Sequence, residues 1–180
     1  ALAYTEAHSA QDVSLAIEYA KEHQIPAFIF GGGSKVLFSD KGFPGIVIHL
    51  VANTITVEGN KLVAASGAKL LDVVTTAEEH GLAGLEKLSG IPGFLGGAVR
   101  GNAGAFGVEI SSCLGSVTAV DLKSGLVKVF HKEECQFSYR ASFFKENKDW
   151  AILTAEFVFR EQKSSDELAA IRKETVAKRE

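Results

Sequence analysis

Glycine is concentrated in one part of this chain, and this concentration constrains the fold more than any other feature of the sequence. Nine of the 18 glycines fall within residues 81–107. Glycine lacks a Cβ, so it permits positive φ angles and lets the backbone approach a ligand or another segment closely. From residue 89 to residue 107 the sequence contains one charged side chain, Arg100. A ligand bound here would be held mainly by main-chain groups, with Asn102 able to meet the edge of a heterocycle. Tight packing of small faces is the alternative explanation.

A second glycine cluster follows a short apolar run. Residues 27–30 predict a strand, which leads into Gly31-Gly32-Gly33 and then Ser34 and Lys35. Consecutive backbone N–H groups in such a loop form a concave site for phosphate oxygens. The spacing matches neither a Walker loop nor the dinucleotide fingerprint. The two clusters together predict a cofactor site, and a flexible turn is the simpler alternative for this loop alone.

Apolar periodicity and turn signals predict a mixed α+β fold. A helix is expected over residues 9–23, capped by Ser9, with an apolar face of Val13, Ala16, Ile17 and Ala20. A second is expected over residues 68–80, ended by Gly81, with Leu70, Leu71, Val74 and Ala77 inward. A charged helix capped by Ser164 or Ser165 ends the chain. Strands are expected at residues 1–5, 27–30, 46–50, 54–58, 61–65, 115–122, 126–131 and 151–159.

Charge, hydropathy and cysteine content exclude several classes of protein. The formal net charge of −3 argues against a broad nucleic-acid surface. Every apolar run is shorter than the roughly 20 residues of a membrane span, and residues 1–30 read as folded structure. Cys113 and Cys135 lack the spacing of metal ligands. We therefore expect a cytoplasmic protein with reduced thiols, no bound metal, and no nucleic-acid or membrane partner.

A third segment brings a phenol and two cations together in a loop-like context. It contains Tyr139, Arg140 and Lys145. An arginine can hold a carboxylate through two parallel hydrogen bonds. The segment indicates an anion site, although a solvated surface loop explains the same residues.

Taken in order, these segments resemble the UDP-N-acetylenolpyruvoylglucosamine reductases, the MurB family. Each glycine motif is unspecific by itself, but the ordered set is specific and runs over nearly the whole chain. The matching motifs are Gly31-Gly32-Gly33-Ser34, Gly42-Phe43-x-Gly45, Leu85-Glu86-x-Leu88-x-Gly90-Ile91-Pro92-Gly93, Gly96-Gly97-Ala98, Gly101-Asn102-Ala103-Gly104-Ala105-Phe106-Gly107 and Tyr139-Arg140-x-Ser142-x-Phe144-Lys145.

The resemblance implies a fold and a cofactor. The fold is an α+β FAD-binding domain of the vanillyl-alcohol-oxidase or PCMH-like class, with FAD held non-covalently between two small α/β lobes. We expect the first lobe over residues 1–67 and the second over residues 68–162. Residues 163–180 would form a connector helix towards a C-terminal substrate domain.

The resemblance also implies roles for individual residues. Arg140 matches the catalytic arginine, which binds the substrate carboxylate, and Tyr139 matches a substrate-site tyrosine. Ile152 would form a wall beside the flavin ring. The expected cofactor-binding residues are Gly31, Gly32, Gly33, Ser34, Lys35, Ile91, Pro92, Gly93, Gly96, Gly97, Gly101, Asn102, Gly104 and Ile152.

The implied reaction belongs to peptidoglycan precursor synthesis. NADPH reduces FAD, and the flavin then reduces the enolpyruvyl group of a small UDP-sugar, giving UDP-N-acetylmuramate without an obligate protein partner. Lys35 and Phe106 stand where the family usually has Asn and Tyr. The family's proton-donating serine and its acidic partner would lie beyond Glu180, so we expect this chain to bind FAD without turnover. Another flavin oxidoreductase of the same fold and a non-catalytic nucleotide-binding module are the alternatives.

Overall fold

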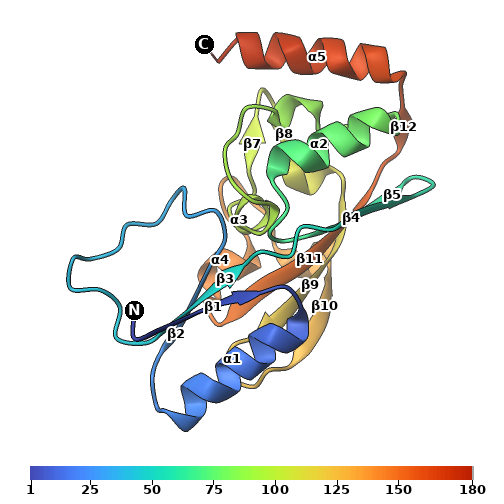
Figure 1. The fold of residues 1–180 in the computed structure, drawn as a ribbon. Coiled ribbons are helices and arrows are strands. Elements are labelled where there is room, and N and C mark those ends of the chain that lie inside the picture. Colours follow the sequence, from blue (N-terminus) through green and yellow to red (C-terminus); the bar gives the residue numbers. More distant parts are fainter. Residues whose placement is uncertain (180) are drawn as a thin grey trace.

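A three-stranded parallel sheet and one helix form the first part of the structure (Figure 1), a computed structural model that describes residues 1–179. The strand order is β1-β3-β2, with β1 at Ala3–Ala7, β2 at Ala27–Phe30 and β3 at Ile46–Leu50. Helix α1 (Ala10–Glu22) connects β1 to β2, and the Ser9 side chain accepts the N–H of Asp12 at its start. The predicted cap is therefore confirmed. So is the predicted apolar face, because all four of its side chains are buried.

An antiparallel sheet of five strands forms the centre of the molecule. Its order is β10-β9-β11-β5-β4. The strands are β4 (Ile55–Glu58), β5 (Lys61–Ala65), β9 (Leu114–Asp121), β10 (Val127–His131) and β11 (Trp150–Val158). The β4–β5 and β9–β10 hairpins confirm both predicted turns. One apolar cluster joins α1 and the parallel sheet to this sheet through Val120, Ala151 and Leu153.

Sheet membership divides the chain earlier than expected. Strand β5 pairs with β11, which is distant in sequence, so the hairpin of residues 55–65 belongs to the second sheet. The change of sheet therefore falls between Leu50 and Ile55, not at residue 67. Hydrogen bonding between distant strands decided this, and no local pattern reports it.

Short helices cover the other face of the antiparallel sheet. They are α2 (Leu70–Glu79), α3 (Leu95–Arg100) and α4 (Phe143–Glu146). Helix α2 begins two residues later than predicted, and its buried residues are Leu70, Val73, Val74 and Ala77. Leu71, predicted to face inward, is 46% exposed, because it lies off the i, i+3, i+4, i+7 stripe that faces the core.

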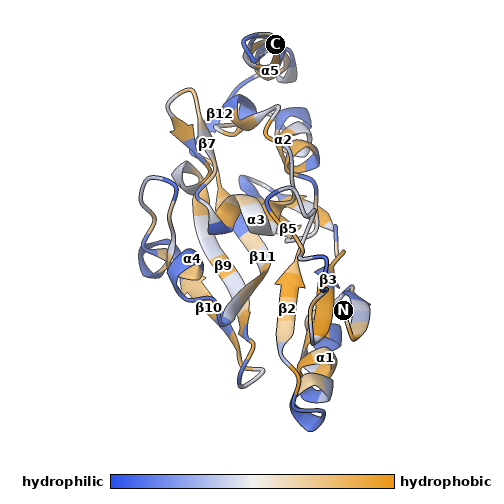
Figure 2. Ribbon diagram, turned by 90° about the vertical axis from the view of Figure 1, so that its left-hand side faces the viewer, coloured by the Kyte–Doolittle hydropathy of each residue, from blue (hydrophilic) through white to orange (hydrophobic). Residues whose placement is uncertain are grey.

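The remaining elements are single turns and two-residue strands. Strand β6 (Leu82–Ala83) pairs with β12 (Glu161–Gln162), and β7 (Gly104–Ala105) pairs with β8 (Val108–Glu109). The 3₁₀ turns are η1 (Glu86–Leu88), η2 (Ile110–Ser112) and η3 (Lys132–Cys135). In Figure 2, β2 and β3 are hydrophobic along most of their length, and the central strand β3 is largely buried.

The last helix, α5 (Ser165–Ala177), packs against α2. Ser164 and Glu167 form a capping box at its start, and Leu168 is buried. The Arg172 guanidinium donates two hydrogen bonds to the Glu78 carboxylate, at 2.7 and 3.3 Å. The expected connector is thus fastened to the domain, across the top of the molecule in Figure 1. None of the helices in residues 1–179 is long and apolar enough to span a bilayer.

Candidate cofactor and anion site

The two glycine clusters meet in the structure. An added Cβ would lie 3.4 Å from the Phe94 ring at Gly31 and 3.1 Å from it at Gly32. An added Cβ at Gly93 would lie 3.3 Å from the hydroxyl oxygen of Ser34. Segments far apart in the sequence therefore form one surface, and glycine is what allows them to come so close.

The first glycine loop offers unused hydrogen-bond donors. Within residues 1–179, no hydrogen bond is donated by the backbone N–H of Gly32, Gly33, Ser34 or Lys35. Gly33 has a φ of +68°, a conformation that favours glycine, and all four residues are exposed. The segment from this loop to β3 projects from the body of the molecule (Figure 1). Free N–H groups on a turn of this kind suit the oxygens of a phosphate.

A stack of rings supports this loop. The Phe30 and His49 rings are nearly parallel, with centroids 4.5 Å apart, and the Phe94 ring continues the stack 6.5 Å from His49. The Tyr4 hydroxyl lies 3.0 Å from His49 Nδ1. Sequence reasoning did not single out Tyr4 or His49. The available signal was a histidine within the apolar run of residues 46–50.

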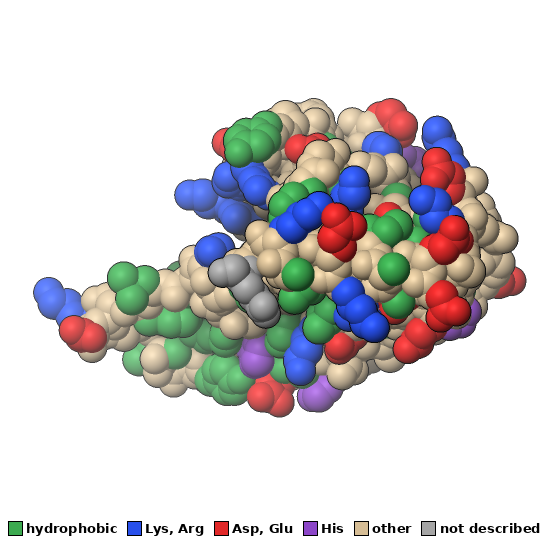
Figure 3. All heavy atoms as spheres, turned by 90° about the horizontal axis from the view of Figure 1, so that it is seen from above, with side chains coloured by type: hydrophobic (Ala, Val, Ile, Leu, Met, Phe, Trp, Pro, Cys, Tyr) green, Lys and Arg blue, Asp and Glu red, His purple; other side chains and the backbone are tan. Residues whose placement is uncertain are grey.

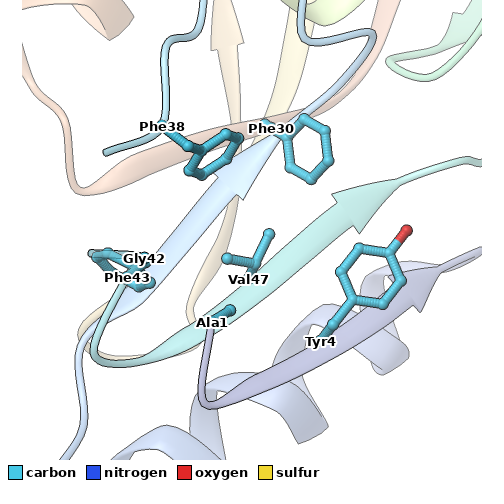
Figure 4. Close-up of a pocket in the computed structure, with 7 residues that line it drawn as sticks. All are labelled: Ala1, Tyr4, Phe30, Phe38, Gly42, Phe43 and Val47. Carbon is cyan, nitrogen blue, oxygen red and sulfur yellow. The ribbon is translucent and has the colours of Figure 1, made fainter. Parts of the chain in front are cut away.

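The outer face of the parallel sheet carries an apolar hollow of about 280 Å³. Figure 4 shows the Phe30 and Phe38 rings on one side of it and Tyr4 on the other. The Tyr4 hydroxyl is the one polar side-chain group of its lining. Phe30 precedes the first glycine loop, but none of the predicted site residues lines the hollow. The hollow therefore lacks the converging polar groups of a reaction site.

The start of the second cluster is tied to residues 66–70. Gly96 donates its N–H to the carbonyl of Ser66, and Leu70 donates to the carbonyl of Gly93. A Cβ added at Gly96 would lie 2.9 Å from that of Ser66, so Gly96 is required for packing. Gly97 is exposed, and a Cβ added there would meet nothing within 4 Å. The space beside Gly97 is therefore open to a ligand, whereas the space beside Gly96 is filled by Ser66.

The Asn102 side chain does not face a ligand. It is fully buried, and its amide nitrogen donates to Glu109 Oε2 at 2.8 Å and to the Ser138 carbonyl at 2.9 Å. Its oxygen accepts the N–H of Ser111. The expectation that this amide reads a heterocycle edge is wrong, because its donors and acceptor are used within the protein.

Two further predicted residues have packing roles in this structure. Gly104 lies in β7, and an added Cβ would approach the carbonyl oxygen of Val108 to 3.0 Å. Ile152 is 5% exposed and belongs to the main core. It faces that core because its neighbours on β11, Ala151 and Leu153, point to α1. Ile152 therefore offers little surface to a flavin ring. The other predicted residues of this cluster, Ile91, Pro92 and Gly101, keep some exposure.

Arg140 lies on an exposed loop that is bonded to the glycine-rich segment. Tyr139 is 83% exposed, and the Arg140 guanidinium carbon lies 5.6 Å from the centroid of its ring. The buried Ser142 hydroxyl donates to the carbonyl of Arg100 at 2.7 Å, at the end of α3. Together with the Asn102–Ser138 bond, this contact sets the loop beside the second glycine cluster. Figure 3 shows a hollow at one side of the molecule with lysine and arginine side chains gathered at its rim.

The two cysteines are poor nucleophiles. Burial raises the pKa of the half-buried Cys113 thiol, and it raises the pKa of Cys135 to about 12. Both sulfurs are therefore protonated near neutral pH, and the thiolate is the reactive form.

Comparison with known proteins identifies the class of domain. Residues 1–130 match the family described as FAD binding domain, and the chain belongs to this family. The fold agrees, because 6-hydroxy-D-nicotine oxidase from Arthrobacter nicotinovorans aligns with a TM-score of 0.66 over 88% of this chain and 36% of that one, at 23% identity. The predicted α+β flavin-binding fold is confirmed.

The more particular resemblance is to UDP-N-acetylenolpyruvoylglucosamine reductases. The reductase of Solibacter usitatus is 42% identical over 143 residues, 79% of this chain and 45% of its own length. That of Paramagnetospirillum magneticum is 44% identical over 160 residues, 84% of this chain and 51% of its own. The crystal structure of the Thermus caldophilus reductase aligns with a TM-score of 0.81 at 27% identity, over 98% of this chain and 62% of that one. The resemblance inferred from the motifs is confirmed, and the chain spans about half the length of the curated relatives it matches.

Proposed function

We propose that this chain is the flavin-binding part of a cytoplasmic, NADPH-dependent reductase that converts UDP-N-acetylglucosamine enolpyruvate to UDP-N-acetylmuramate. One observation carries the proposal. The loop of Arg140 is bonded to the glycine-rich segment through Asn102 and Ser142. A side chain suited to a carboxylate is thereby set beside the expected flavin site, as a reductase of an enolpyruvyl substrate requires. The names of the relatives support the same substrate.

The residues around the first loop fit FAD. The unused N–H groups from Gly32 to Lys35 would bind its pyrophosphate, with Gly31 and Gly93 allowing close approach. The exposed Gly97 would let a flat ring lie against the main chain, and Ile91, Pro92 and Gly101 would line the rest. FAD, when bound, supplies the hydride chemistry.

Arg140 would bind the substrate carboxylate and stabilise negative charge that develops as the enolpyruvyl group is reduced. Its guanidinium is exposed and forms no ion pair within residues 1–179, so it is free for a ligand. The attraction would strengthen once the ligands exclude water from the site. Tyr139, beside the guanidinium, would contact the same substrate.

Absorbance and heat release test the cofactor. We expect the purified chain to show flavin absorption, or to quench the fluorescence of added FAD, and to release FAD on heating. A colourless protein that leaves added FAD fluorescence unchanged would count against the proposal and favour a non-catalytic module.

Substrate identity needs a separate measurement. We expect UDP-N-acetylglucosamine enolpyruvate to perturb the flavin spectrum, and Arg140→Met to abolish the change while FAD remains bound. A spectrum that ignores this ligand would favour another flavin oxidoreductase of the same fold.

A further inference from the structure

The backbone of Arg140 adopts a conformation that L residues rarely occupy. Its φ is +56°, in the left-handed region. A non-glycine residue persists there when surrounding contacts hold it. The loop around it is a tight turn, in which Ser138 and Ala141 exchange backbone hydrogen bonds of 3.1 Å. Within this turn, the carbonyl oxygen of Arg140 accepts a hydrogen bond from a side chain outside it.

Lys145 supplies that partner. Its ammonium nitrogen donates to the carbonyl oxygen of Arg140 at 2.7 Å. Within residues 1–179 the ammonium forms no ion pair, so this carbonyl is its protein partner. A hydrogen bond from a charged donor is stronger than one between neutral groups.

Lys145 projects from an anchored element. It lies on α4, whose Phe144 is fully buried in the main core. Ser142, at the start of α4, is bonded to the carbonyl of Arg100. The Arg100 guanidinium in turn lies 3.4 Å from the carbonyl oxygen of Lys145, a long contact. The base of the lysine is therefore held firmly, and its ammonium can fix the turn above it.

We propose that Lys145 is a positioning residue for Arg140: its ammonium holds the left-handed backbone that sets the guanidinium in place for a substrate carboxylate. The effect on substrate binding rests on the proposed function, whereas the contact between Lys145 and Arg140 does not. A purely structural lysine would change stability when removed. A positioning lysine changes the conformation of Arg140 and the affinity for a carboxylate ligand.

The conformation is tested directly by NMR of isotope-labelled protein. Lys145→Met removes the donor, Lys145→Arg keeps a cationic donor, and Lys148→Met removes the same charge from a nearby exposed site. We expect the Cα and Cβ shifts of Arg140 to leave their left-handed values in Lys145→Met and to stay there in Lys145→Arg and Lys148→Met. Wild-type shifts for Arg140 in Lys145→Met would overturn the proposal.

The consequence is tested by titrating FAD-loaded protein with UDP-N-acetylglucosamine enolpyruvate and following flavin absorbance. We expect Lys145→Met to weaken binding on the order of tenfold, the loss of one charge-assisted hydrogen bond, with FAD affinity unchanged. Lys145→Arg should restore binding. An equal loss of affinity for this ligand in Lys145→Met and Lys148→Met would overturn the proposal. If wild-type protein ignores the ligand, the proposed function fails, and the NMR result still decides the role of Lys145.

Discussion

The side-chain amide of Asn102 donates to the carbonyl of Ser138 at 2.9 Å and so joins the glycine-rich segment to the Arg140 loop. The same amide nitrogen bonds the Glu109 carboxylate, and the residue is fully buried. The relationship explains why an asparagine stands among glycines. Its side chain holds two segments together, one of which is the glycine-rich segment that we propose to line the flavin.

Replacement of Asn102 by alanine should destabilise the chain. The change leaves the Ser138 carbonyl and the Glu109 carboxylate without this donor, which costs about 2–4 kcal/mol of unfolding free energy. Urea denaturation followed by circular dichroism measures it. Asn53→Ala is the matched control, because Asn53 is exposed. Equal stability of the two variants would show that the Asn102 side chain does not hold the two segments together.

Alanine substitutions at two glycines with positive φ distinguish an effect on flavin binding from the effect of backbone strain alone. Gly33 (φ +68°) and Gly125 (φ +81°) both have space for a Cβ, with nothing closer than 3.8 Å. Alanine at either position should cost about 1 kcal/mol of stability. Gly33→Ala should also weaken FAD binding by about tenfold, because alanine disfavours the positive φ that sets the loop's N–H groups towards phosphate, at the cost of roughly one hydrogen bond. Gly125→Ala should not, because it lies in the β9–β10 turn. Fluorescence titration with FAD measures both, and equal affinities would show that the loop does not bind the cofactor.

We expect the buried thiol of Cys135 to make the protein less stable at high pH. Burial is the main cause that raises its thiol pKa from 9.0 to about 12, and the carboxylates of Glu134 and Glu133 raise it further. The unfolded chain therefore loses this proton before the folded chain does. The contribution of Cys135 is complete below pH 9 and falls as pH rises towards 12, by at most about 1.4 kcal/mol per pH unit.

The comparison variant is Cys135→Ala. It should be less stable at pH 7, because it leaves a cavity, but its unfolding free energy should fall less steeply between pH 9 and pH 10.5. If the unfolding free energies of the two proteins, measured by urea denaturation, fall equally steeply with pH, the Cys135 thiol is not the cause of the loss.

The ion pair of Arg172 and Glu78 should hold α5 on the domain. Both side chains are largely covered, with exposed fractions of 27% and 11%. Arg172→Met should cost about 1–2 kcal/mol and speed amide hydrogen exchange in α5, because a covered two-point pair contributes more than an exposed one. Lys178→Met breaks the exposed Lys178–Glu174 pair and should change stability by less than about 0.5 kcal/mol. Unchanged exchange in Arg172→Met would show that apolar packing alone holds the helix.

Local patterns in the sequence were sufficient for much of the fold. The apolar face of α1, its Ser9 cap and the two hairpins each depend on residues a few positions apart, where periodicity and turn chemistry act. The ordered motifs were also sufficient for the family. Such features carry their information in the chain itself, so they could be predicted without coordinates.

The tertiary structure alone decided which distant groups meet. Strand β5 joined β11, Ile152 turned into the core, and the Asn102 amide turned inward. Residue type does not determine these outcomes, because an amide or an ammonium can bond a ligand or the protein equally well. The choice depends on where carbonyls such as those of Ser138 and Arg140 are placed by the rest of the fold. The sequence therefore identified a flavin-binding domain, and the three-dimensional packing determined which of its residues remain free to bind and which hold the site together.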